Sequence, residues 1–244
     1  MQKTAEGHLL KDDLSNYNHS KYERPSVTVD IIICSIIDDT LKVLLIKRKH
    51  PPYRGRWAIP GGFVQIENKE TLEETAHREL LEETNLKGLF IEQLKTYGDP
   101  DRDPRMRVIT VAYYALVPYY SKMKIKRLIC AGDDAAEAEW FSLRHPLLRQ
   151  DEVAFDHATI LRDVLERIQG KATYSPILFN LVPKKFTWAE LMRVYELVIG
   201  REFLAPNFRR WIKNQYKIRK HNDYSNSGGR PSRLLSYAGE RKRI

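Results

Sequence analysis

The stretch GGFVQIENKETLEETAHRELLEETNL, residues 61–86, decides the fold, because it joins a glycine pair to a densely acidic helix. Residues three and four positions apart are neighbours on a helix, so Glu79, Glu82 and Glu83 fall on one face. Like charges at this spacing repel and weaken a helix. Since carboxylate oxygens are the ligands that hard divalent cations prefer, these three residues are candidate ligands of Mg²⁺ or Mn²⁺.

The acidic helix has two interpretations. Charge clusters on helices are commonly solvated faces, and Arg78 is placed to pair with Glu74 or Glu82, four residues away on either side. In the functional interpretation, the glutamates bind a metal and the glycine pair forms a turn that lets the backbone approach a ligand. Carboxylates, metal and a tight turn together predict chemistry on a diphosphate.

The same stretch resembles the signature of the Nudix hydrolases, G-x5-E-x7-R-E-U-x-E-E-x-G-U, in which U is bulky and apolar. The residues in register are Glu70, Arg78, Glu79, Leu80, Glu82, Glu83 and Leu86. The gap from Gly62 to Glu70 is two residues longer than in the signature, which bears on how phosphates are held. Asn85 replaces the second glycine, a mild change because Asn tolerates left-handed backbone.

The resemblance implies a catalytic role for part of this set. Glu82 and Glu83 are expected to be the main metal ligands, and Arg78 is expected to orient the carboxylates. The general base is not fixed by the signature. Glu137 and Glu139 are candidates for it, with plain loop charges as the alternative.

Candidate ligand contacts lie around this stretch. They are Arg48, Arg56, Gly61, Gly62, Phe63, Arg102 and Arg107. The arginine fork suits phosphate groups, although each arginine taken alone is also a plausible surface residue. Phe63 or Trp57 is placed to stack on a base, with a core position as the alternative. His157 is interpreted as a structural residue that caps a helix together with Asp156.

Outside this stretch, apolar runs predict a mixed sheet. Strands are expected over 27–37, 41–47, 57–60, 90–97, 108–117 and 138–141, with helices over 71–84 and 154–169, the latter ending at Gly170. Leu72, Ala76 and Leu80 form the buried stripe of the first helix. The fold class is therefore α/β, a Nudix-type mixed-sheet α/β/α sandwich.

Charge separates the chain into two parts with different expected partners. From residue 171 onward, 16 Lys and Arg face 5 Asp and Glu, whereas the preceding residues hold 25 against 27. The 244 residues suffice for one large or two modest domains. The N-terminus lacks an apolar signal core and no long apolar run occurs, so we expect a cytoplasmic protein with no membrane partner. Cys34 is expected to be a buried thiol, and with Cys130 it makes no disulfide framework.

The basic part has the order of a winged helix-turn-helix. Thr187 and Glu190 form a capping box, Gly200 ends the helix, Pro206 begins a second helix, and a hairpin centred on 228–229 follows. In such domains the second helix enters the DNA major groove. The candidate DNA contacts are Asn207, Arg209, Arg210, Lys213, Arg219, Arg230 and Arg233. Phe208, Trp211 and Ile212 are expected to face the core. The alternative is a basic subdomain used for dimerisation.

Both parts together resemble the Nudix-related transcriptional regulators of NAD metabolism and their sugar-sensing relatives. The matching stretches are LLIKR at 44–48, GGFV at 61–64, GDPDRDPR at 98–105, AYYAL at 112–116, FDH at 155–157, FTWAEL at 186–191, YELVIG at 195–200, NFRRWI at 207–212 and GRP at 229–231. The expected organisation is a leader over 1–24, a Nudix domain over 25–170, a docked linker over 171–186 pinned by Phe179, Leu181 and Phe186, and a winged-helix domain over 187–244.

This resemblance implies a homodimeric repressor of NAD-synthesis or sugar genes that binds a double-stranded DNA operator. In the NAD branch, ADP-ribose or a related nucleotide binds the Nudix-like domain and releases the DNA. Many members have a degraded signature and no catalysis. This chain keeps Glu79, Glu82 and Glu83, so hydrolysis of the effector, as by an ADP-ribose pyrophosphatase, is also expected. A Nudix hydrolase whose basic domain does not bind DNA remains the alternative.

Overall fold

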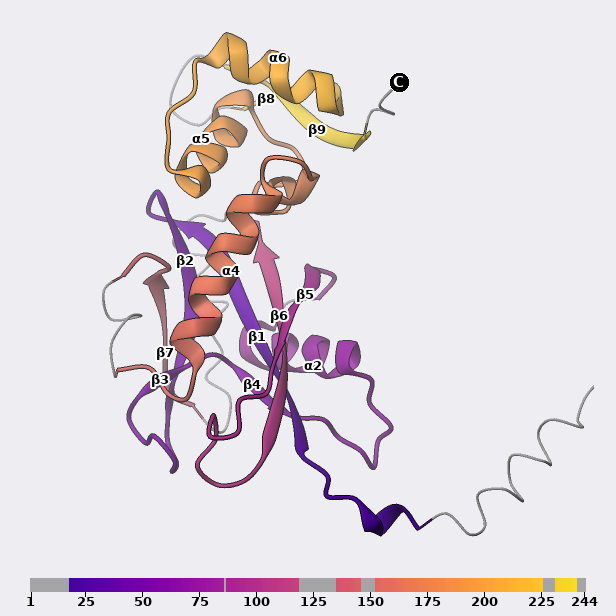
Figure 1. Cartoon of the computed structure of the whole chain (residues 1–244). Helices are drawn as coiled ribbons and strands as arrows, with labels where there is room; N and C mark the ends of the chain where they lie inside the picture. Colours follow the sequence, from indigo (N-terminus) through magenta and orange to yellow (C-terminus); the bar gives the residue numbers. More distant parts are fainter. Residues whose placement is uncertain (1–17, 86, 119–134, 146–151, 226–230, 241–244) are drawn as a thin grey trace, which may run out of the picture.

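A computed structural model describes residues 18–85, 87–118, 135–145, 152–225 and 231–240. Its larger part is built on a seven-stranded mixed sheet with the order β3-β2-β1-β6-β5, in which β4 also pairs with β1 and β7 with β2 (Figure 1). The strands are β1 Ser26–Ile37, β2 Thr40–Arg48, β3 Trp57–Ala58, β4 Gly61–Phe63, β5 Phe90–Tyr97, β6 Val108–Val117 and β7 Ala135–Ser142. A short 3-10 helix, η1 His19–Lys21, precedes them.

Strand β1 is at the centre of the sheet. It runs parallel to β6 and antiparallel to both β2 and β4. Successive residues of a strand point to opposite faces. Val29, Ile31 and Ile33 accordingly pack in the core on one side of the sheet, and Ile32 and Cys34 in the core on the other. Because both faces are covered, β1 is buried from Val29 to Ile37, and only Asp30 and Ser35 in this stretch are polar.

One helix covers each face of the sheet. On one face, α2 Leu72–Thr84 packs Ala76 and Leu80 against β1 and β6. On the other, α4 His157–Lys171 buries a stripe of apolar residues, Ile160, Leu161, Val164 and Ile168. The α/β/α arrangement is thereby confirmed.

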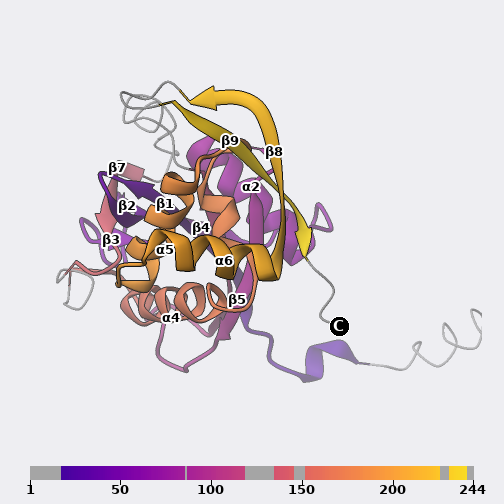
Figure 2. The same cartoon turned by 90° about the horizontal axis from the view of Figure 1, so that it is seen from above.

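The second part of the molecule stands at the end of α4 (Figure 1). It comprises the 3-10 helix η3 Pro176–Leu181, the helices α5 Trp188–Ile199 and α6 Ala205–Gln215, and the antiparallel strands β8 Tyr216–Ser225 and β9 Ser232–Glu240. Seen from above, α6 crosses the top of the molecule with the β8–β9 hairpin beside it (Figure 2). Two helices followed by a two-stranded hairpin confirm the winged helix-turn-helix.

The segment before α5 is docked as expected. Phe179, Leu181 and Phe186 are all buried. Phe186 exchanges backbone hydrogen bonds with Leu235 of β9, so it forms a one-residue bridge on the edge of β9 that faces away from β8. The buried residues of α4, η3, α5, α6 and β9 form one continuous core.

The structure confirms the helix termini predicted at Thr187 and Gly200 and contradicts the one predicted at Gly170. Thr71 and Thr187 each form a complete capping box, with Glu74 and Glu190 respectively. Gly200 ends α5 with φ 81°, and Asn85 ends α2 in the left-handed conformation that its sequence position predicted. Gly170, by contrast, lies inside α4, which ends at Lys171 with a right-handed cap residue.

Two further expectations were wrong in detail. Residues 154–156 do not begin α4, because the backbone of Ala154 pairs with Trp57 and Phe155 has φ 54°. The glycine pair is no turn but part of β4, where Gly61 pairs with Asp30 of β1. A Cβ on Gly61 would lie 2.4 Å from the carbonyl oxygen of Val29, so glycine permits this close pairing.

Cys34 is fully buried, as expected, and burial raises the pKa of its thiol. Cys130 lies outside the described residues. Within the described ranges, no helix is long and apolar enough to cross a membrane.

Candidate functional site

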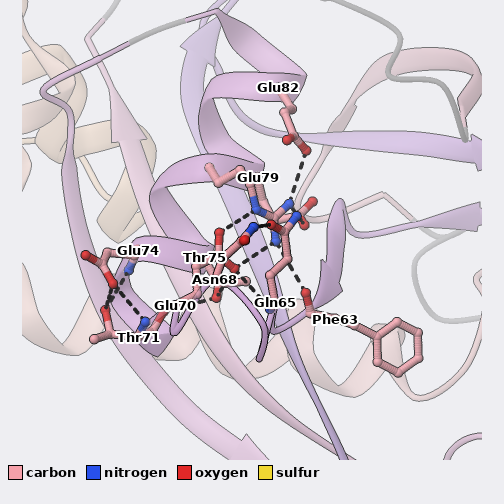
Figure 3. A network of polar contacts seen from close by, with 10 residues as sticks. Phe63, Gln65, Asn68, Glu70, Thr71, Glu74, Thr75, Glu79 and Glu82 are labelled. Atoms are coloured by element: carbon pink, nitrogen blue, oxygen red, sulfur yellow. Dashed lines mark hydrogen bonds and ion pairs between the residues drawn. The ribbon is translucent and has the colours of Figure 1, made fainter.

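The acidic helix carries a network of charges at the edge of the sheet (Figure 3). Arg78 is its hub: Nε donates to Glu70 at 2.8 Å, and Nη1 donates to Glu79 at 2.7 Å and to Glu82 at 3.3 Å. Nη2 also donates to the carbonyl oxygen of Phe63, so the guanidinium ties α2 to β4. Arg78 therefore contacts three carboxylates of this stretch, and its role in orienting them for a metal stays a prediction.

The expected pair of Arg78 with Glu82 forms, whereas the alternative pair with Glu74 does not. Glu74 instead accepts hydrogen bonds from the backbone and side chain of Thr71 in the capping box. Glu70, eight residues before Arg78, forms an ion pair with Arg78 where Glu74 does not. Hydrogen bonds from Arg78 lower the pKa of Glu70 to about 2, so Glu70 is ionised near neutral pH.

Glu79 is confined by burial and by the close approach of Gly62. It is buried, and burial raises its pKa, although the hydrogen bond from Arg78 opposes that shift. A Cβ on Gly62 would lie 2.2 Å from Glu79 Oε1. The glycine at 62 therefore makes room for a carboxylate of the protein.

The predicted metal ligands are three glutamates of α2, Glu79, Glu82 and Glu83. Glu79 and Glu83 are buried and Glu82 is exposed, and all three line one cavity. Among the described residues, no three acidic, His or Cys side chains lie close enough together to hold one ion. The donor chemistry of the three carboxylates fits a hard cation.

The cavity has a volume of about 820 Å³, within the range of ligand sites in proteins. Strands β1, β2 and β4, helix α2 and the loop before β6 contribute to its wall. Among its lining residues are Asp30, Arg48, Gly61, Gly62, Phe63, Arg78, Glu79, Glu82, Glu83, Arg102, Asp103, Arg105, Phe155 and His157. Five of the seven predicted ligand contacts therefore lie together in one cavity.

Two of the predicted arginines belong to the cavity but are held by the protein. Arg102 is 7% exposed and forms a two-pronged ion pair with Asp156, with donor–acceptor distances of 3.0 and 2.8 Å. Arg48 donates to the carbonyl oxygen of Pro52 and lies over the ring of Phe155. Both side chains are thus oriented before a ligand arrives.

The other two arginines and the proposed bases lie elsewhere. Arg56 packs over Tyr53, Arg107 is exposed, and neither lines the cavity. Glu137 pairs with Lys47, and Glu139 is exposed on β7, so neither faces the cavity either. Of the two aromatic candidates, Phe63 lines the cavity and is 43% exposed, whereas Trp57 packs edge-on against Phe141.

Residues 30, 103, 105 and 157 are cavity residues that the sequence did not identify as such. Asp103 and Arg105 pair with each other through two hydrogen bonds of 3.0 and 2.8 Å. His157 is buried at the start of α4, and its Nδ1 accepts a hydrogen bond from the backbone of Ile59. The predicted cap by Asp156 is wrong, because its carboxylate binds Arg102 instead of the helix backbone.

The basic surface of the second part centres on α6. Phe208 and Ile212 are buried and Trp211 packs beside them, as expected. Asn207, Arg209, Arg210 and Lys213 are exposed, and Arg210 donates to Asn207 at 3.2 Å. On the hairpin, Arg219 and Arg233 are exposed, while Arg230 lies outside the described residues. The predicted DNA contacts that the structure describes thus come from the second helix and the wing.

Comparisons with known proteins match both parts. Residues 27–164 match the NUDIX domain family, and residues 178–237 match the NrtR DNA-binding winged helix domain. The chain is 33% identical over 226 residues, 92% of its length and 87% of the relative, to the "ADPR responsive transcriptional repressor NtrR" of Acinetobacter baylyi. It is also 42% identical over 162 residues, 66% of this chain and 85% of the relative, to the "ADP-ribose pyrophosphatase" of Methanocaldococcus jannaschii.

Among solved structures, Shewanella oneidensis NrtR complexed with a 27mer DNA is similar over the whole arrangement. The TM-score is 0.75 at 31% identity, with 89% of this chain and 98% of that chain covered. The similarity therefore extends over both domains and their connection.

Proposed function

Because this chain belongs to the NUDIX family and carries a winged helix of the NrtR DNA-binding type, we propose that it is a transcriptional repressor of NAD-metabolism genes. ADP-ribose, or a closely related nucleotide, is its effector and binds in the cavity beside α2. Effector binding releases the operator. The protein acts as a homodimer, since a symmetric dimer matches a palindromic operator.

One observation carries this proposal. A cavity lined by arginines and carboxylates and a basic helix-turn-helix belong to the same chain and share one hydrophobic core. The cavity offers the arginines Arg48, Arg102 and Arg105 beside the carboxylates of α2. A polar, partly cationic cavity suits a diphosphate. The exposed arginines of α6 suit the edges of bases and the phosphates of a duplex.

Contacts between the two domains give effector binding a physical route to the DNA surface. The carbonyl oxygen of Val198, in the last turn of α5, accepts hydrogen bonds from Arg144 at 3.1 Å and from Gln169 of α4 at 2.9 Å. Arg193 of α5 pairs with Asp39 in the turn after β1. A shift of α4 or of the β1–β2 hairpin would therefore move α5, against which α6 packs.

We also propose that the protein hydrolyses ADP-ribose slowly, so that the effector is destroyed after it has acted. Hydrolysis adds one water across the diphosphate bridge and yields AMP and ribose 5-phosphate. A bound Mg²⁺ or Mn²⁺ supplies charge neutralisation and a more acidic bound water. Glu79, Glu82 and Glu83 would hold it, Arg78 would position their carboxylates, and Gly62 would leave the room that Glu79 needs.

Gly62→Ala is expected to lower turnover about 100-fold, because the added Cβ displaces a ligand carboxylate by an ångström or more. The variant's AMP release, followed at saturating Mg²⁺, measures this effect. Gly88→Ala is not a suitable control, since Gly88 has φ 67°. Gly170→Ala is suitable, because a Cβ there meets nothing within 4 Å. Equal turnover in Gly62→Ala and Gly170→Ala would contradict the assigned role of Gly62.

Isothermal titration calorimetry with ADP-ribose tests the proposed effector. We expect saturable binding of one ADP-ribose per chain, and much weaker binding of free ribose or arabinose, which lack the diphosphate. Tighter binding of a free sugar than of ADP-ribose would replace this proposal with a sugar-responsive repressor of the same architecture.

A further inference from the structure

Asp30 is a buried carboxylate in the cavity wall with no hydrogen bond among the described residues. It lies in the middle of β1, is 7% exposed and lines the cavity. Oδ2 is almost entirely buried and accepts no hydrogen bond from the residues that the structure describes. The Arg102 guanidinium, 3.7 Å from it, balances the charge but lies beyond hydrogen-bonding distance. A buried polar group without a partner costs stability, so its retention calls for a functional explanation.

A hydrogen-bond donor stands beside this acceptor. His157 Nδ1 accepts a hydrogen bond from the backbone N–H of Ile59 and therefore carries no proton. Burial lowers the pKa of His157, so its ring is neutral and its proton is on Nε2. Nε2 lies 3.9 Å from Asp30 Oδ2, too far for a direct hydrogen bond. The cavity wall thus presents one acceptor and one donor that do not satisfy each other.

A hydroxyl group is the ligand chemistry that matches this pair. A hydroxyl both donates and accepts, so it can give its proton to the carboxylate and take a hydrogen bond from Nε2–H. Oxygen atoms in such contacts lie about 2.8 Å from each partner. This spacing is compatible with groups 3.9 Å apart once the carboxylate turns Oδ2 from its enclosed position toward the cavity. A phosphate oxygen fits poorly, because it would face the carboxylate with like charge.

We propose that Asp30 and His157 together recognise one secondary hydroxyl of a ribose in the bound ligand. This inference rests on the proposed binding of ADP-ribose and names the contact that selects its sugar. Arg102, oriented by Asp156, fixes the carboxylate by charge alone and leaves its hydrogen-bonding capacity to the ligand. Gly61 leaves room for the carboxylate, because a Cβ there would lie 2.6 Å from Asp30 Oδ1.

The test compares ADP-ribose with four analogues that each lack one secondary alcohol, at the 2′, 3′, 2″ or 3″ position, and that all keep the anomeric 1″ hydroxyl of the terminal ribose. Hydrogen bonds to a charged group contribute about 1.5–3 kcal/mol, so the wild-type protein should bind one analogue roughly 10- to 100-fold more weakly than ADP-ribose. Asp30→Ala should bind ADP-ribose with a similar loss. The same variant should bind ADP-ribose and that analogue within about twofold of each other, because the contact is already missing.

Three features of the design separate the outcomes. Asp101→Ala is the matched control, since Asp101 is an exposed carboxylate in the loop beside Arg102 and does not line the cavity. The analogue series in the wild-type protein needs no variant, so it stands even if Asp30→Ala unfolds, which thermal unfolding would reveal. Asp30→Asn keeps the side-chain size and one acceptor oxygen but removes the charge, so it should weaken the discrimination less than Asp30→Ala does.

Equal affinity of the wild-type protein for all four analogues and ADP-ribose would overturn this inference while leaving the proposed effector intact. Additive losses from Asp30→Ala and from the missing hydroxyl would overturn it as well. No binding of ADP-ribose by the wild-type protein would overturn the proposed effector, and the inference with it.

Discussion

Replacing Arg209 and Arg210 by Ala is expected to weaken duplex binding at least about 30-fold. Both side chains are exposed on α6, in the part of the second helix that enters the major groove in helix-turn-helix proteins. Each arginine contact to a base edge contributes about 1–3 kcal/mol, and the losses of two contacts roughly add. If either arginine contacts phosphate instead, the slope of log affinity against log salt concentration falls by about 1 per contact.

Fluorescence anisotropy with a labelled duplex at several salt concentrations measures both quantities. Arg54→Ala combined with Lys87→Ala is the matched control, because it removes the same charge from exposed positions outside the winged helix. An equal loss in the two double variants would mean that net charge alone drives binding. Unchanged binding in the Arg209 and Arg210 variant would make the basic domain a dimerisation element.

Glu83→Gln is expected to reduce AMP release from ADP-ribose at least about 100-fold. Substitutions of residues that merely support a metal ligand cost about 10- to 100-fold, so loss of a direct ligand should cost at least as much. The substitution preserves the size of this buried side chain, and the fold should therefore survive. Excess Mn²⁺ should restore part of the activity if the loss is one of metal affinity.

Glu73→Gln is the control for this prediction. Glu73 belongs to the same helix but is exposed and does not line the cavity, so its replacement should leave turnover within about twofold. Turnover unchanged in Glu83→Gln would exclude the acidic face of α2 as the catalytic site. Absence of turnover in the wild-type protein would make the Nudix domain a sensor without catalysis.

The sequence predicted the features of this protein that depend on neighbours along the chain. The capping box of α5, the acidic face of α2 and the apolar face of α6 all follow from spacings of three and four residues. The left-handed cap at Asn85 follows from a local preference of the residue type. Such signals locate helices, and with them the side chains that a helix presents together.

The features that the sequence did not reveal depend on contacts between distant segments. Asp30 sits in an apolar strand, and only the pairing of β1 with β4 and the approach of α4 place it beside His157. The partner of Arg102 is 54 residues away, so the pattern GDPDRDPR alone could not show that this arginine is held by Asp156. The glycine pair was taken for a turn because its true constraint, the closeness of Val29 and Glu79, is tertiary.

The central claim is that a ligand bound in the Nudix cavity controls the affinity of the winged-helix domain for DNA. An electrophoretic mobility shift assay of the wild-type protein tests it most directly, on a duplex that the protein itself selects from a random library, with and without ADP-ribose. Ca²⁺ in place of Mg²⁺ during the short incubation limits hydrolysis of the effector. The account predicts a shifted band that ADP-ribose abolishes, while AMP and ribose 5-phosphate leave it unchanged. A shifted band that persists at saturating ADP-ribose would contradict the account.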